Sequence, residues 1–191
     1  MRISEQFVAV IFDVDGVLID TMGYHADAWV RAGQELGVEV DEEEVYRREG
    51  EPGLKTAKDF MRIAGMMSTK ARARAFVGKK EEVYQQIAAQ PRVFPNATQL
   101  LDALEQCGML LAFVTGTSRE EIRRTLPPVF EPYFKTSVCG DEVMRGKPNP
   151  EPYMAAMRTL GTNPRETLVI ENAPYGIRSG KNRRRDRLGD P

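Results

Sequence analysis

Hydrophobic residues occur along the chain in short continuous runs that alternate with helix-like repeats. Four of these runs predict strands, at residues 8–13, 110–115, 136–139 and 168–171. Short apolar runs are typical of strands buried on both faces, and their alternation with helices is typical of a parallel sheet. Because connections between parallel strands are right-handed, the pattern predicts an α/β fold with a Rossmann-like, doubly wound parallel sheet.

Capping residues place two of the connecting helices. Ser118, followed by Glu121, forms a capping box that begins a helix ending near Leu126, just before two prolines. Gly108 suits the C-terminal cap of a helix that leads into the strand at 110–115. We therefore expect one helix on either side of the second strand.

The segment between the first two predicted strands breaks the alternation. It carries helical patterns at residues 24–36, 41–49, 54–64 and 69–89, and no convincing strand. A long helical insertion at this point is the expected form of a lid over the sheet. We predict that residues 21–94 form an inserted α-helical cap domain.

The C-terminal stretch differs from the rest of the chain. Residues 181–191 hold five Lys and Arg residues and one aliphatic residue, so no strand is predicted there. We expect the sheet to lack its C-terminal edge strand and this basic tail to be disordered or truncated, with nucleic-acid binding as the alternative. The α/β core is then predicted to comprise residues 1–20 and 95–180.

Composition and charge limit the kinds of partner. A chain of 191 residues that is 41% hydrophobic can bury a core. Its net charge of −1 and pI near 6.0 create no overall field that would attract nucleic acid or an anionic membrane. We expect neither as a partner, so any anion site must be local. With no long apolar run and no signal peptide, the predicted location is cytoplasmic and the default state a monomer.

The two cysteines, Cys107 and Cys139, stand alone and follow no metal-binding or redox spacing. A chain of this size needs no disulfide framework. We predict that both are buried and pack as small apolar residues.

The first predicted strand ends in two acidic residues, Asp13 and Asp15, followed by Gly16. Side chains two positions apart on an extended chain share a side, so the two carboxylates should lie close together and repel each other. A divalent cation, a shared proton, or attack by one carboxylate while the other moves a proton would relieve this repulsion. An ordinary strand end with turn-forming residues gives the same pattern, so other segments must decide.

The second strand and a later loop offer groups that can hold a phosphate. Thr115, Gly116 and Thr117 follow the second strand, where a hydroxyl and the amides of the next helix can bind phosphate oxygens. Lys147 lies in a proline-flanked loop, where it can neutralise both a carboxylate and a phosphoryl oxygen. These residues predict an anion site next to the two aspartates.

The last predicted strand ends in Glu171 and Asn172, which carry oxygen atoms of the kind that Mg²⁺ requires. Ligands of doubly wound sheets bind beyond the carboxyl ends of the strands. Because Asp13, Thr115 and Glu171 all fall at such ends, we expect them to meet in one site.

Together these residues resemble the four motifs of the haloacid dehalogenase superfamily. The match spans nearly the whole chain, and a helical cap between the first two motifs resembles the β-phosphoglucomutase-like branch. The segment 20–29 is also similar to the one that follows the first motif in that branch. In order, the motifs are Asp13-Val14-Asp15-Gly16, Thr115, Lys147 and Glu171-Asn172.

The resemblance implies a role for each motif residue. Asp13 would be the nucleophile and Asp15 the general acid and base, while Thr115 and Lys147 would hold the phosphoryl group. Mg²⁺ would be bound by Asp13, by the main-chain carbonyl of Asp15 and by an acidic residue of the fourth motif.

Three further positions are interpreted through the same resemblance. Asn172 stands where the family more often carries Asp, so either Asn172 or Glu171 is the direct metal ligand. His25 matches a histidine that assists sugar-phosphate turnover, with a plain packing role as the alternative. Lys80 resembles a cap lysine that contacts the distal group of the substrate.

The activity that the resemblance implies is a Mg²⁺-dependent phosphatase of small phosphorylated metabolites, sugar phosphates among them, with an aspartyl-phosphate intermediate. A phosphosugar mutase is the alternative, although the cap segment 49–55 does not closely reproduce the mutase pattern. A dehalogenase acting without metal, and a non-catalytic or inactive binding protein, also stay open. Asn172 and the unusual C-terminus are the features that favour the inactive protein.

Overall fold

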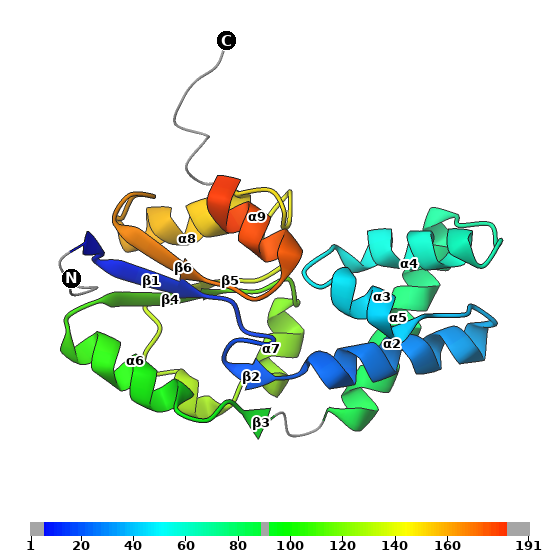
Figure 1. Cartoon of the computed structure of the whole chain (residues 1–191), viewed down its shortest axis with the longest axis horizontal. Coiled ribbons are helices and arrows are strands. Elements are labelled where there is room, and N and C mark those ends of the chain that lie inside the picture. Colours follow the sequence, from blue (N-terminus) through cyan, green and yellow to red (C-terminus); the bar gives the residue numbers. More distant parts are fainter. Residues whose placement is uncertain (1–5, 89–91, 183–191) are drawn as a thin grey trace, which may run out of the picture.

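The computed structural model describes residues 6–88 and 92–182. Figure 1 shows an α/β part beside a helical part, which lies beyond the carboxyl ends of the strands. The main sheet is parallel, with strand order β5-β4-β1-β6, so the predicted fold class is confirmed. Its strands are β1 (Ala9–Phe12), β4 (Leu110–Val114), β5 (Thr136–Val138) and β6 (Thr167–Ile170).

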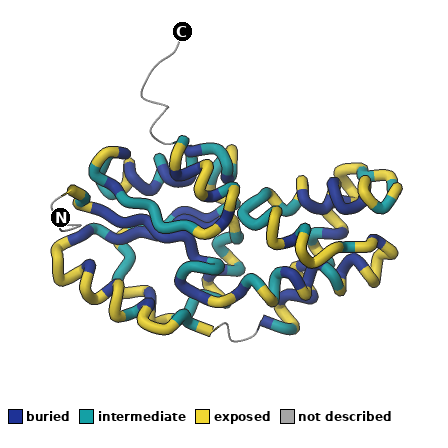
Figure 2. The backbone as a smooth tube through the Cα atoms, viewed as in Figure 1, coloured by how far each residue is buried: buried dark blue, intermediate teal, exposed yellow. Residues whose placement is uncertain are grey.

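Alternate residues of the central strand β1 face opposite layers, as the pleat of a strand requires. Val10 and Phe12 pack on the side covered by α6 (Ala97–Gln106). Ile11 packs on the other side with buried residues of α8 (Glu151–Leu160). Figure 2 shows the result, with buried strands enclosed by helices whose outer faces are exposed. The continuous apolar run in the sequence reflects this two-sided burial.

The capping residues act as predicted. The Ser118 hydroxyl accepts a hydrogen bond from the backbone amide of Glu121 and begins α7 (Arg119–Thr125). Gly108 follows α6 with φ +73°, a left-handed conformation that a residue without a Cβ adopts at little cost. Both helix ends therefore come from local sequence.

Four helices with their own apolar core form the helical part, which we call the cap. The Trp29 ring lies edge-on to Phe60 and Phe76, with centroids 5.8 and 5.1 Å away. Each predicted helix of this segment is present, with ends that differ by a few residues. They are α2 (Met22–Leu36), α3 (Glu42–Arg47), α4 (Gly53–Ile63) and α5 (Lys70–Ile87).

A short second sheet joins the cap to the α/β part. The strands β2 (Ile19–Asp20) and β3 (Arg92–Val93) pair antiparallel. The prediction that the segment between the first two main strands holds no strand was therefore wrong at β3. A strand of two residues is too short to produce a detectable hydrophobic pattern in the sequence. It pairs because the segment that enters the cap and the segment that leaves it lie side by side (Figure 1).

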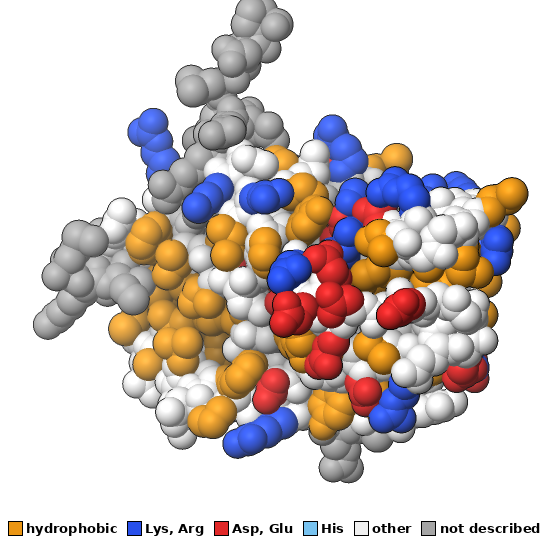
Figure 3. Space-filling model, turned by 45° about the vertical axis from the view of Figure 1, so that its right-hand side comes forward, with side chains coloured by type: hydrophobic (Ala, Val, Ile, Leu, Met, Phe, Trp, Pro, Cys, Tyr) orange, Lys and Arg blue, Asp and Glu red, His pale blue; other side chains and the backbone are white. Residues whose placement is uncertain are grey.

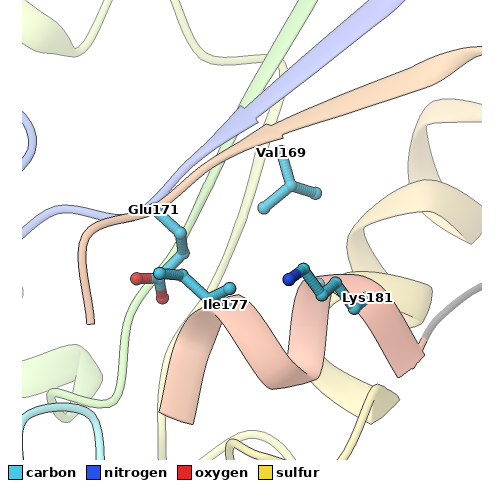
Figure 4. Close-up of a pocket in the computed structure, with 5 residues that line it drawn as sticks. Val169, Glu171, Ile177 and Lys181 are labelled. Atoms are coloured by element: carbon cyan, nitrogen blue, oxygen red, sulfur yellow. The ribbon is translucent and has the colours of Figure 1, made fainter. Parts of the chain in front are cut away.

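The C-terminal boundary also needs a correction. The helix α9 (Pro174–Asn182) includes the first residues assigned to the basic tail, and 183–191 lie outside the described residues. Within the described ranges β6 pairs only with β1, so it is an edge strand as expected. A crevice of about 250 Å³ lies beside this edge and is lined by Val169, Glu171, Ile177, Gly180 and Lys181. Figure 4 shows four of these side chains between β6 and α9.

The two cysteines differ in exposure. Cys139 is buried as predicted, but Cys107 is exposed, so the prediction for Cys107 was wrong. It lies at the C-terminal cap of α6, whose buried face is formed by Ala97, Leu101 and Leu104.

In the described part of the chain, no helix combines the length and apolar character that crossing a bilayer requires.

Candidate active site

A buried lysine joins two of the predicted motifs. Lys147 Nζ donates hydrogen bonds to Asp13 Oδ1 at 2.8 Å and to Glu171 Oε1 at 2.6 Å. It also lies 3.3 Å from the carbonyl oxygen of Val114 at the end of β4. Lys147 and Asp13 are 4% and 5% exposed, so this ion pair is shielded from water. The predicted cation therefore lies at the carboxyl ends of the strands, as expected from their order.

The Glu171 carboxylate is held by more than Lys147. Tyr153 in α8 donates its hydroxyl to Glu171 Oε1 at 2.9 Å, and the Ala173 backbone amide donates to Oε2 at 2.8 Å. Both carboxylate oxygens are therefore engaged. These contacts fix the orientation of the Glu171 carboxylate.

Asp15 lies among hydroxyl groups from two motifs. The Thr21 hydroxyl donates to Asp15 Oδ1 at 2.7 Å, while the Thr115 and Thr117 hydroxyls donate to Oδ2 at 3.3 and 3.2 Å. The predicted phosphate-binding threonines therefore contact Asp15 directly. Between them, the backbone of Gly116 packs against Gly140, where an added Cβ would lie 2.0 Å from the Gly116 carbonyl oxygen.

A histidine and a lysine from the cap continue this network. His25 Nε2 lies 3.4 Å from Asp15 Oδ1, and Lys80 Nζ donates to His25 Nδ1 at 2.9 Å. The His25 ring stacks on Tyr84 with centroids 4.3 Å apart. Since Nδ1 accepts from an ammonium group, the neutral ring carries its proton on Nε2, facing Asp15. The structure thus places Lys80 beside His25, which in turn lies next to Asp15.

The charges of the site differ from one residue to the next. Burial raises the pKa of Asp13 to about 7. The positive charge of Lys147 lowers this pKa, whereas the negative charges of Glu171 and Asp15 raise it. Burial also opposes ionisation of Asp15, but hydrogen bonds from His25, Thr21 and other hydroxyls hold its pKa well below the usual range. Burial, followed by the charge of Lys80, lowers the pKa of His25. The neighbourhood of Asp13 therefore carries excess negative charge.

The donor set fits Mg²⁺ through charge and oxygen chemistry. Asp13 and Glu171 both contact Lys147, and Asp15 lies close enough to raise the pKa of Asp13, so an added cation would offset the surplus negative charge. Across the described ranges, no three His, Cys, Asp or Glu side chains group as a metal site, because Glu171 turns to Lys147 and Tyr153. Oxygen atoms that Mg²⁺ could use beside Asp13 are the neutral main-chain carbonyl of Asp15 and the side-chain amide of Asn172.

Gly16 allows the turn after the two aspartates to form. Its φ of +77° is left-handed, and its amide donates to the carbonyl oxygen of Ile19 at 2.8 Å. An added Cβ would lie 2.2 Å from Asn172 Nδ2 and 3.1 Å from Glu49 Oε1. Only glycine fits between the first motif, the fourth motif and the cap.

Sequence reasoning did not single out Glu49, which reaches the site from the cap. It follows α3, and its Oε1 accepts a hydrogen bond from Asn172 Nδ2. The Gly and Pro residues of segment 49–55 are typical of a turn, and they are the local signal that could have pointed to it. Figure 3 shows acidic side chains gathered near the middle of one face, with basic side chains mostly toward its edges.

The geometry can be compared with known proteins. The family model for haloacid dehalogenase-like hydrolases matches residues 10–188. The chain belongs to this family. It is therefore a hydrolase of this type, and the resemblance stated from the four motifs is confirmed. Residue roles within the site are taken up below as proposals.

Two relatives of this hydrolase have names that state a phosphatase activity. It is 30% identical to the phosphorylated carbohydrates phosphatase of Thermotoga maritima, covering 91% of this chain and 80% of that protein. It is 29% identical to hexitol phosphatase A of Escherichia coli, covering 89% of this chain and 76% of that protein.

A solved structure shows the same fold with its cap. A protein of Bacteroides vulgatus named as a putative β-phosphoglucomutase superposes with a TM-score of 0.80 at 32% identity, covering 92% of this chain and 72% of that one. By structure, this hydrolase falls on the β-phosphoglucomutase-like branch of the family, as its helical cap predicted.

Proposed function

We propose that this hydrolase is a Mg²⁺-dependent phosphatase of small phosphorylated metabolites, with sugar and polyol phosphates as the substrate class. The observation that carries the proposal is the buried contact of Lys147 with Asp13, next to an Asp15 surrounded by hydroxyls. Relatives near 30% identity whose names state action on phosphorylated carbohydrates and hexitol phosphates support the substrate class.

In the proposed reaction the Asp13 carboxylate attacks phosphorus. The new bond joins an Asp13 oxygen to phosphorus, and the bond to the leaving oxygen breaks. That oxygen receives a proton from His25 Nε2 through Asp15, because Asp15 itself is ionised in the resting site. Water then attacks phosphorus, the bond between Asp13 and phosphorus breaks, a proton of that water returns through Asp15 to His25, and inorganic phosphate leaves. Lys147 and Thr115 hold phosphoryl oxygens throughout. Mg²⁺, held by Asp13, the Asp15 carbonyl and Asn172, would neutralise charge on the phosphoryl group.

The contact between Lys80 and His25 supports a route for the proton of Asp15. We expect Lys80→Met to lower kcat by about 10- to 100-fold, because His25 then loses the donor that orients its ring and supplies a proton. Lys79→Met is the matched control, because Lys79 pairs with Glu35 and Glu82 on the cap surface. Steady-state kinetics on one phosphomonoester compare the two variants. Equal kcat values for both would remove Lys80 from the catalytic network.

The cap supports a phosphatase over a mutase. A mutase must rebind an intermediate that carries a second phosphate, which needs an unpaired cation on the cap side. In the described cap, Arg48 pairs with Glu51 and Asp59, Lys55 pairs with the same two acids, and Lys80 contacts His25. The cations nearest the site are thus already engaged, which suits a substrate whose distal end carries hydroxyls.

A panel of sugar and polyol monophosphates with Mg²⁺ tests the proposal. We expect release of inorganic phosphate, faster for polyol and sugar monophosphates than for a bisphosphate, measured by a colorimetric phosphate assay. Isomerisation of a sugar phosphate without phosphate release, followed by NMR, would identify a mutase. Absence of turnover across the panel, with Mg²⁺ present, would favour the binding protein.

A further inference from the structure

The loop after α3 touches the core through two acidic residues. Glu49 Oε1 accepts a hydrogen bond from Asn172 Nδ2, and Glu51 Oε1 accepts one from the Tyr175 hydroxyl at 2.7 Å. Gly50 lies between them with φ +76°, and an added Cβ there would lie 3.2 Å from Ala173 Cβ. The loop is therefore docked on the segment that follows β6, as the path of the chain in Figure 1 also shows.

The two acids are held differently within the loop. The Glu51 side chain is fully buried and also accepts hydrogen bonds from Thr56 Oγ1 at 2.9 Å, Arg48 Nη1 at 3.1 Å, and Lys55. Glu49 is half-buried, and its carboxylate accepts the hydrogen bond from Asn172. Glu51 is thus held by groups of the cap as well as by Tyr175 of the core, whereas Glu49 bonds to the core through Asn172.

The pairing of Glu49 with Asn172 needs an amide on the core side. An ionised carboxylate only accepts hydrogen bonds, whereas an Asn side chain supplies two N–H donors. An Asp at position 172 would place two carboxylates against each other above Gly16, where the space is already tight. The amide at the fourth motif therefore has a use in this chain that an acid could not serve.

We propose that Glu49 is a positioning residue that holds the cap loop closed on the amide of Asn172. The hydrogen bond orients the amide so that its nitrogen faces the cap and its oxygen faces away from Glu49. A carboxylate at position 172 would repel Glu49 and weaken the closed arrangement. The presence of Asn at 172, where the family more often carries Asp, is therefore explained by Glu49 on the cap. The inference relies on the proposed function only for what the closed cap encloses.

Hydrogen exchange on a reciprocal pair of variants tests this inference. The variant Asn172→Asp sets two acids against each other, whereas Asn172→Asp with Glu49→Gln restores one donor and one acceptor in exchanged positions. We expect Asn172→Asp to speed amide exchange in segments 46–56 and 171–177 by about tenfold, the scale of one charge-assisted hydrogen bond. The double variant should return within about threefold of the wild-type rate.

A control variant and a separate check complete the test. Glu43→Gln removes the same charge from exposed α3, where Glu43 pairs with Arg47, and should leave exchange in both segments unchanged. Melting temperatures show whether each variant is folded, and exchange needs no substrate, so its outcome does not depend on phosphatase activity. Effects of the two substitutions that simply add, without recovery in the double variant, would overturn the inference.

Discussion

Replacement of Asp13 by Asn is expected to lower kcat by about 10⁴-fold or more. An amide of nearly the same shape is not a nucleophile, so no aspartyl phosphate can form. The fold should be unaffected, because burial already raises the pKa of Asp13 to about 7, and a neutral group at this position removes an unfavourable charge. Phosphate release and thermal melting measure the two halves of the prediction.

The matched control for this variant is Asp27→Asn. Asp27 lies on the exposed face of α2, where it pairs with the exposed Arg31. We expect kcat within about twofold of wild type for this control, as for most surface substitutions. Substantial turnover by the Asp13 variant, above that of a mock preparation, would show that another residue attacks phosphorus.

Replacement of Lys147 by Met is expected to abolish activity and to destabilise the fold by about 3–5 kcal/mol. The loss is large because Lys147 is 4% exposed and bonds to both Asp13 and Glu171, which would otherwise be buried without a cation. Urea unfolding followed by circular dichroism measures the change. Lys135→Met, at an exposed position before β5, is the control and should change stability by less than about 0.5 kcal/mol.

The free energy of unfolding lost in the Lys147→Met variant should depend on pH, and the pKa of Asp13 gives the direction of that dependence. With Lys147 present, the folded-state pKa of Asp13 is about 7, above its ordinary value of 3.8. A carboxyl group raised in this way favours the fold when protonated, and that contribution is lost as pH rises from about 4 through the folded pKa. Removing Lys147 raises this pKa further. The stability gap to wild type should therefore be smaller at pH 5 than at pH 8, and a constant gap would contradict the charge argument.

The sequence predicted the main sheet and the position of the site well, for a local reason. Each strand is a short apolar run, and parallel strands bring their carboxyl ends to one edge. Asp13, Thr115 and Glu171 could therefore be assigned to one site before any contact was known. The same reasoning missed β3, whose two residues leave no pattern, and misjudged Cys107, because exposure at a helix end depends on which side of the helix meets the sheet.

What the sequence alone determined about this protein is the order of its elements, its family and the types of residue at each strand end, since these are encoded by neighbouring residues. The tertiary structure decided how those residues are paired. It placed Lys147 between Asp13 and Glu171, Lys80 behind His25, and Glu49 against Asn172. These partners are far apart along the chain, so only packing of the cap against the sheet brings their charges and hydrogen-bonding groups within reach of each other.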